Sequence, residues 1–136
     1  MKNRNRLSER EELLMELMWK SPRPLTSVEL LRRPEMEGWN EVYMYRALKS
    51  LSDKGLIRVC GVKQHKTQYA RQFEPVFTKE EYAVKLLTDR GMKRSSIAKI
   101  AMALVEDIDD EKEEETDELI GELESIIEKL RKDKEQ

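Results

Sequence analysis

The sequence predicts a mainly α-helical protein with one small β-hairpin, and three observations carry this prediction. Helix-capping patterns recur at Ser8, Thr26 and Thr78, each with a glutamate three residues later. Residues 39–73 have the pattern of a helix that leads directly into two short strands. After Thr78 the hydrophobic spacing is helical only. We therefore expect a small helical unit that carries a β-hairpin, followed by a helical tail.

Capping boxes open the first two helices. The first begins at the capping box 8–11 and ends before the segment 21–24, because its two prolines lack an amide donor. Leu25 is expected in a short strand, and a second capping box at 26–29 opens a helix that ends before Pro34. The buried stripe of the first helix is predicted to be Leu13, Leu14, Leu17 and Met18.

The third helix is followed at once by the hairpin. Asn40 caps this helix, and Gly55 suits the left-handed position past its end. Strands are predicted at 56–62 and 67–73, joined by the basic turn 63–66. The predicted core stripe of the helix is Met44, Ala47, Leu48 and Leu51.

The tail is expected to contain three helices. One follows Thr78 and is broken by Gly91, another starts at Ser95 or Ser96, and the last follows the acidic segment 106–118. The apolar stripe of the last helix can fold back on its own domain or bury against a second chain. We favour a second chain, because the acid-rich tail offers little else to cover it. The residues expected to hold this dimer are Leu104, Ile120, Leu123, Ile127 and Leu130.

Composition excludes several classes of protein. Of 136 residues, 38% are hydrophobic and 40% charged, and the net charge of −2 conceals a basic first part and an acidic tail. No apolar run is long enough to span a membrane, and no signal core follows the basic start. One cysteine, Cys60, excludes an intramolecular disulfide and a cysteine-rich metal site, which fits a reduced cytoplasmic location.

Motifs of an enzyme are missing from the sequence. There is no glycine-rich phosphate loop and no Gly-x-Ser-x-Gly, and the single histidine, His65, lies in the predicted turn. We expect no catalysis, no metal and no cofactor. Cys60 is interpreted as a small packing residue rather than a redox sensor, and Trp19 and Trp39 as core anchors rather than base-stacking groups.

The polar side of the third helix is the main candidate site. An arginine can donate two hydrogen bonds to guanine, and amide or hydroxyl groups can bond bases or phosphates. An ordinary solvated helix face is the alternative, and Tyr45 lies between the two faces. The residues expected opposite the core stripe are Asn40, Tyr43, Arg46 and Ser50.

The predicted turn adds Lys63, His65 and Lys66, which suit phosphate contacts. A recognition helix beside a basic hairpin tip is the working half of a winged helix-turn-helix. The sequence therefore predicts a winged-helix DNA-binding domain at 1–77 and a helical dimerisation domain at 78–136.

The order of motifs resembles the penicillinase-repressor family (BlaI/MecI/CopY type). The likeness rests on Leu-Ser-Glu-Arg-Glu at 7–11, Trp-Asn at 39–40, Ala-Leu-Lys-Ser-Leu at 47–51 and Lys-Gly-Leu-Ile at 54–57. It covers nearly the whole chain, most strongly residues 7–82. The resemblance implies a homodimeric bacterial transcription repressor on a palindromic operator, and it adds Val42 to the DNA-contacting positions.

The resemblance does not indicate the inducing signal or the operator sequence. The Asn-Phe cleavage bond of antibiotic-responsive members corresponds here to Ala103-Leu104, and the tail lacks the cysteines of copper-responsive members. Two other functions stay open: a winged-helix adapter that binds proteins, and a winged-helix regulator that binds a small ligand between its tail helices.

Overall fold

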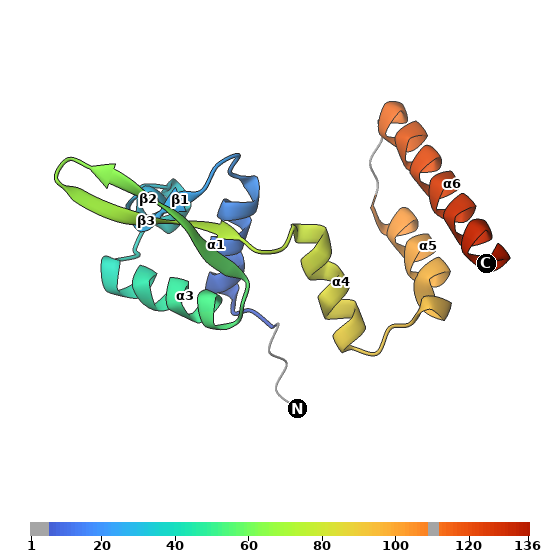
Figure 1. Ribbon diagram of the computed structural model, residues 1–136, viewed down its shortest axis with the longest axis horizontal. Helices are drawn as coiled ribbons and strands as arrows, with labels where there is room; N and C mark the ends of the chain where they lie inside the picture. Colours follow the sequence, from blue (N-terminus) through green and yellow to red (C-terminus); the bar gives the residue numbers. More distant parts are fainter. Residues whose placement is uncertain (1–5, 109–111) are drawn as a thin grey trace. The chain divides into compact units, whose positions relative to one another are not determined.

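The computed structural model describes residues 6–108 and 112–136, and the chain divides into two compact units, Met1–Met92 and Lys93–Gln136. Figure 1 traces both units from the amino to the carboxyl end. The first unit holds the hairpin and most helices, and the second consists of helices alone.

The first unit starts with the helices that the capping patterns predict. Ser8 accepts a hydrogen bond from the Glu11 amide while the Glu11 carboxylate accepts one from the Ser8 amide, and Thr26 and Glu29 repeat this arrangement. Both capping boxes are thus confirmed. The elements in chain order are α1 (Glu9–Lys20), β1 (Leu25–Thr26), α2 (Ser27–Leu31), the 3-10 helix η1 (Pro34–Met36) and α3 (Glu41–Asp53).

The hairpin consists of β2 (Ile57–His65) and β3 (Gln68–Pro75), and β1 adds a third antiparallel strand in the order β1-β3-β2. Its strands are longer than the sequence predicts, since the cross-strand register continues to the pair His65 and Gln68. The turn is therefore Lys66-Thr67, and the expected turn at 63–66 is wrong. Lys63 lies inside β2, opposite Ala70. The register also shifts between Val59 and Gly61, which is a β-bulge.

The core of the first unit lies between the helices and the sheet. The four predicted core residues of α3 are all buried, which confirms that stripe. On α1, Met15 is buried while Leu13 is only partly covered, so that stripe was predicted in part. Burial of each large aliphatic side chain contributes on the order of 1.5–3 kcal/mol. The core therefore fixes α3 on its inner side.

Helix α4 (Lys79–Asp89) belongs to the same unit. Its Tyr82 is buried and lies 5.6 Å from the ring of Trp19, measured between centroids. The indole nitrogen of Trp19 donates to the carbonyl of Phe77 at 2.9 Å. This confirms Trp19 as a core anchor. The compact unit thus extends through Met92, one helix beyond the boundary after residue 77 that the sequence analysis drew.

The second unit holds the 3-10 helix η2 (Arg94–Ser96), α5 (Ile97–Asp107) and α6 (Glu113–Glu135). Among its described residues no side chain is buried. An amphipathic helix owes most of its stability to packing of the apolar face. The helices of the second unit therefore carry apolar faces that the unit itself leaves uncovered. Part of the acidic segment, 109–111, lies outside the described residues.

Candidate nucleic-acid interface

Helix α3 presents a face that the fold does not use. The side chain of Val42 is 61% exposed and that of Tyr45 is 66% exposed, while Arg46 and Lys49 are exposed without an ion-pair partner in the described part of the chain. At 100° per residue, Val42, Arg46 and Lys49 lie opposite the buried stripe, and Tyr45 lies at the border of the same face. The face combines two cations, one aromatic ring and one branched aliphatic group, and all four can reach an external partner.

Two predicted contact residues lie on a different side of α3. Tyr43 packs edge-on against Trp39, with ring centroids 4.9 Å apart, and the Arg10 guanidinium lies 4.6 Å from the centre of its ring. Ser50 is partly buried and donates to Glu11 at 2.9 Å. The expected placement of Ser50 opposite the core is therefore wrong, whereas Tyr43, at 37% exposed, stays on the surface at the flank of α3. Both turn toward α1, where they help to hold α3 in place.

Asn40 and Arg46 are placed as the sequence predicts. Asn40 is exposed, and its side-chain oxygen Oδ1 accepts a hydrogen bond from the backbone amide of Tyr43 at 2.7 Å. The side-chain NH2 group of Asn40 is therefore left available for an external partner. Arg46 projects from the middle of the exposed face. Lys49 was missed, although its position three residues after Arg46 places it on the same side of a helix. Tyr45, which the sequence left between faces, is on this side too.

A buried carboxylate fixes the far end of α3. Glu11 is 8% exposed, and Lys54 at the end of α3 donates to both of its oxygens at 2.8 and 2.9 Å. Burial raises the pKa of Glu11, but the Lys54 ammonium, the Ser8 amide and the Ser50 hydroxyl outweigh burial, so the net pKa lies below 4.5. The charged carboxylate therefore links α1 to both the flank and the end of α3.

The β2–β3 hairpin, which we call the wing, presents fewer free cations at its tip than the sequence predicts. Lys63 donates to Glu29 of α2 at 3.1 Å and is thus occupied within the protein. Lys66 is at the tip with a φ of 57°, in the left-handed region that costs a side-chain-bearing residue on the order of 1 kcal/mol. The Nε2 atom of His65 is enclosed without a hydrogen-bond partner in the described part of the chain. Of the three predicted wing residues, Lys66 is exposed, whereas Lys63 and His65 are partly buried.

The outer face of the hairpin carries groups that the sequence analysis did not single out. Arg71 is exposed opposite Val62, and Tyr69 is 70% exposed opposite Gln64. Period-2 alternation along β3 places these two side chains on one face, but only the correct register reveals their neighbours. Figure 1 shows the hairpin tip and the amino-terminal end of α3 pointing toward the same end of the first unit. The exposed cations Arg46, Lys49, Lys66 and Arg71 thus occur on the two elements that extend there.

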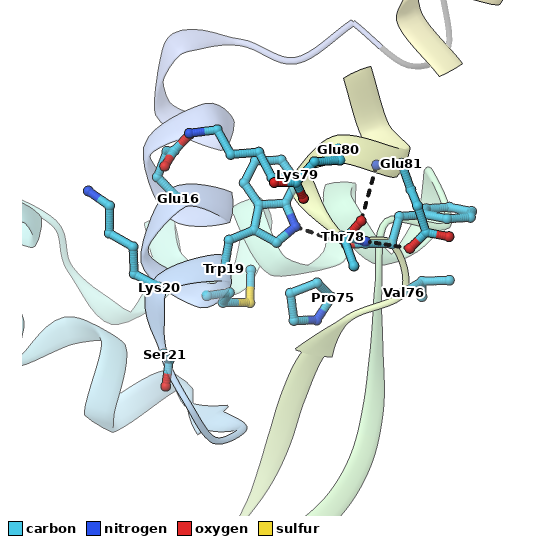
Figure 2. A pocket seen from close by; sticks show the side chains of 12 residues that line it. Glu16, Trp19, Lys20, Ser21, Pro75, Val76, Thr78, Lys79, Glu80 and Glu81 are labelled. Carbon is cyan, nitrogen blue, oxygen red and sulfur yellow. Dashed lines mark hydrogen bonds and ion pairs between the residues drawn. The ribbon is translucent and has the colours of Figure 1, made fainter. Parts of the chain in front are cut away.

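An open cleft of about 540 Å³ lies where the end of α1 meets the start of α4. Figure 2 shows Trp19 and Pro75 in this cleft, with Glu16 and Lys79 meeting beside the indole; their ion pair measures 2.7 Å. The Thr78–Glu81 capping box lies on the opposite side of the cleft. Its polar atoms are engaged with one another, and the geometry points to no particular ligand.

The tail residues predicted for dimerisation are all solvent-exposed within the single chain. Their exposed fractions are 50% for Leu104, 48% for Ile120, 37% for Leu123, 49% for Ile127 and 45% for Leu130. Leu119 and Ile126 widen the same stripe of α6. Uncovered apolar faces of this extent mark interaction surfaces in soluble proteins.

The remaining predictions concern Cys60, metal binding and membrane-spanning helices. Cys60 is exposed at the bulge rather than packed, so its interpretation as a packing residue is wrong. Partial desolvation of the sulfur and the nearby Glu74 carboxylate raise the pKa of its thiol. Within residues 6–108 and 112–136, no group of three or more His, Cys, Asp or Glu side chains is arranged to hold a metal ion. No helix in those ranges is long and apolar enough to cross a membrane.

The element order and the sheet register define the class of fold. Three helices, a short strand paired to the hairpin and a hairpin following α3 constitute a winged helix-turn-helix, here followed by a helical tail. The predicted fold class is thus confirmed.

Comparison with protein-family models and with curated protein sequences found no match. Among solved structures, the chain is similar to MarR from Staphylococcus aureus in complex with salicylate and kanamycin, at 21% identity and a TM-score of 0.42, covering 93% of this chain and 75% of that one. It is also similar to PerR from Streptococcus pyogenes, at 17% identity and a TM-score of 0.40, covering 52% of this chain and 47% of that one. The chain therefore spans less than half of that PerR chain.

Proposed function

We propose that this chain is a DNA-binding transcription regulator that inserts α3 into the major groove and places the wing tip on the flanking backbone. The observation that carries the proposal is that the three sides of α3 have different environments. Its inner stripe is buried, its flank is held by Glu11, and its outer face keeps Arg46 and Lys49 free of intramolecular partners in the described residues. A helix held firmly on two sides with free cations on the third fits the requirements of groove recognition.

The chemistry of the outer face assigns roles to individual residues. Arg46 is the candidate for bidentate bonding to guanine, and Val42, one turn earlier, can contact a thymine methyl group. Lys49 and the wing cation Lys66 can neutralise phosphates, which supplies affinity without sequence information. Tyr43 and Ser50 support α3 from its flank instead of reading bases. In this arrangement, Asn40 contacts DNA through its free amide hydrogens.

The repressor role and the twofold arrangement form the finer part of the proposal. They rest on the resemblance to penicillinase repressors and on the uncovered apolar stripes of α5 and α6. A homodimer held by residues 104–130 would present two α3 helices to a palindromic operator, because protein symmetry is matched by half-site symmetry. The domain roles, DNA binding for 1–77 and dimerisation for 78–136, belong to this proposal too.

Selection of bound sites from random duplex DNA with the full chain tests the proposal. We expect an enriched palindrome and an affinity that falls steeply with salt concentration. Arg46→Ala should relax base preference at one position per half-site by about 1–3 kcal/mol, whereas Arg90→Ala, an exposed arginine at the end of α4, should leave base preference unchanged. Equal losses on selected and random DNA would contradict base reading by Arg46. Absence of salt-sensitive DNA retention would favour the adapter alternative.

A further inference from the structure

The hairpin extends well beyond the body of the first unit. Strand β1 pairs with β3 only at Phe73 and Gln72, and beyond Gln72 the two hairpin strands pair only with each other. Among the hydrogen bonds and ion pairs of the described residues, the outermost one that joins the hairpin to the body is that of Lys63 with Glu29. The segment 64–69 lies past this contact.

Glu29 is itself held in a fixed position. One of its oxygens accepts from the Thr26 amide at 3.0 Å, and its own amide donates to the Thr26 hydroxyl at 3.2 Å. Thr26 is fully buried and is paired with Gln72 in the sheet. The second oxygen of Glu29 then meets the Lys63 ammonium at 3.1 Å and the Arg23 guanidinium at 3.8 Å. The carboxylate is thus anchored to the core on one side and to the hairpin on the other.

The three side chains of this ion-pair cluster differ in their exposure to solvent. The side chain of Glu29 is only 13% exposed, whereas that of Lys63 is 39% exposed and that of Arg23 is 69% exposed. Burial raises the pKa of Glu29, but the Thr26 amide and the Lys63 ammonium outweigh it, and the pKa falls to about 2. The carboxylate of Glu29 therefore stays ionised near neutral pH, where it can pair with the Lys63 ammonium.

A small rotation of the hairpin displaces its tip strongly. The bulge between Val59 and Gly61 is a natural bending point, and Lys66 lies five residues beyond Gly61. At roughly 3.3 Å per residue the lever is about 16 Å long, so a tilt of about 10° moves the tip by about 3 Å. A shift of that size is enough to lose a hydrogen bond from Lys66 to a phosphate.

We propose that Glu29 is a positioning residue for the wing, which holds the hairpin to α2 through Lys63 and thereby sets the reach of the tip relative to α3. Only the consequence for DNA rests on the function proposed above. The competing role of Lys63 is the one expected from the sequence, a direct phosphate contact. The two roles predict opposite effects of removing the Glu29 charge.

The experiment compares Glu29→Gln, Lys63→Met and the double variant in the full chain. Glutamine can keep the cap of α2, because its carbonyl oxygen still accepts from the Thr26 amide. Methionine keeps an aliphatic stem of similar length. Lys66→Met is the matched control, since it removes a wing cation without touching the contact between Glu29 and Lys63.

The first readout is the backbone amide order parameter of the free protein by nuclear magnetic relaxation. Both single variants should lower the order parameters of residues 64–69 from the rigid value of about 0.85 toward about 0.6. The order parameters of residues 57–60 should stay unchanged. Lys66→Met should leave them as in the unmodified chain. Unchanged order parameters for 64–69 in both variants would overturn the proposal, whatever the protein does with DNA.

The second readout is affinity for the selected DNA across a range of salt concentrations. Glu29→Gln and Lys63→Met should each weaken binding about 2–5-fold, with the double variant no weaker than either single one. Their salt slopes should fall by less than one and by the same amount in both variants, because a loosened tip loses part of the Lys66 contact to phosphate, whereas Lys66→Met should reduce the slope by about one. Tighter binding by Glu29→Gln would identify Lys63 as a phosphate ligand and refute positioning. If the unmodified chain binds no DNA, the proposed function fails, and the order parameters alone decide the role of Glu29.

Discussion

Replacing Ile127 with alanine should weaken self-association of the chain by a calculable amount. Ile127 is 49% exposed on the apolar stripe of α6, so a partner helix can cover about half of its surface. Complete burial of an isoleucine contributes roughly 1.5–3 kcal/mol, and half of that is about 0.7–1.5 kcal/mol per copy. A twofold interface contains the residue twice, which gives about 1.5–3 kcal/mol per dimer. The dissociation constant should therefore rise about 10–150-fold.

Sedimentation equilibrium of the full chain over a wide concentration range measures this change directly. Ser125→Ala is the matched control on the same helix. Ser125 faces away from the stripe at 100° per residue, and its hydroxyl donates to the Gly121 carbonyl of its own helix at 3.1 Å. Its variant should associate like the unmodified chain.

Two results would contradict the reasoning about the tail. One is a dissociation constant for Ile127→Ala that stays within twofold of the unmodified chain, because the stripe would then be uncovered in the assembly. The other is an unmodified chain that sediments as a monomer at every concentration. Either result would remove α6 from the interface, and the second would also remove the homodimer from the proposed function.

Leu123→Asp should abolish the dimer, since an unpaired carboxylate buried at that seam costs several kcal/mol; an unchanged mass by light scattering would argue against the seam. Ser50→Ala should lower the free energy of unfolding by about 1–2 kcal/mol, because Glu11 loses a donor, while base preference in site selection stays the same; altered base preference would restore Ser50 to the contact surface. The folded-state pKa of Glu29 is about 2 against an ordinary value of 4.5, so the stability that Glu29 contributes is present above pH 4.5 and is lost as the pH falls toward 2. Urea unfolding at several pH values should show this loss in the unmodified chain and a smaller one in Glu29→Gln; identical pH profiles would remove Glu29 as the cause.

Local patterns in the sequence predicted most helix starts correctly. The capping boxes at Ser8, Thr26 and Thr78 are all present, because a side chain and an amide three residues apart need no distant partner. The core stripe of α3 is likewise a property of one helix. Such features depend on neighbouring residues only, and a single sequence contains the information for them.

Contacts between distant residues account for what the sequence analysis missed. Ser50 meets Glu11 across 39 positions and Lys63 meets Glu29 across 34, and no local pattern marks either pair. The length of the hairpin strands depends on their register, which moved Lys63 from the turn into β2. Lys49 is different, because helical spacing from Arg46 was enough to place it on the outer face.

If the proposed dimer forms, the tail helices, which bury none of their own side chains, make the lifetime of the protein depend on its abundance. When few copies are present, solitary chains would expose long apolar stripes and fraying helices, which proteases cleave readily. As synthesis rises, pairing would shield the same stripes and lengthen the lifetime of every copy. Under the proposed dimer, the active species therefore accumulates more steeply than the rate of synthesis, which sharpens the threshold at which a promoter responds.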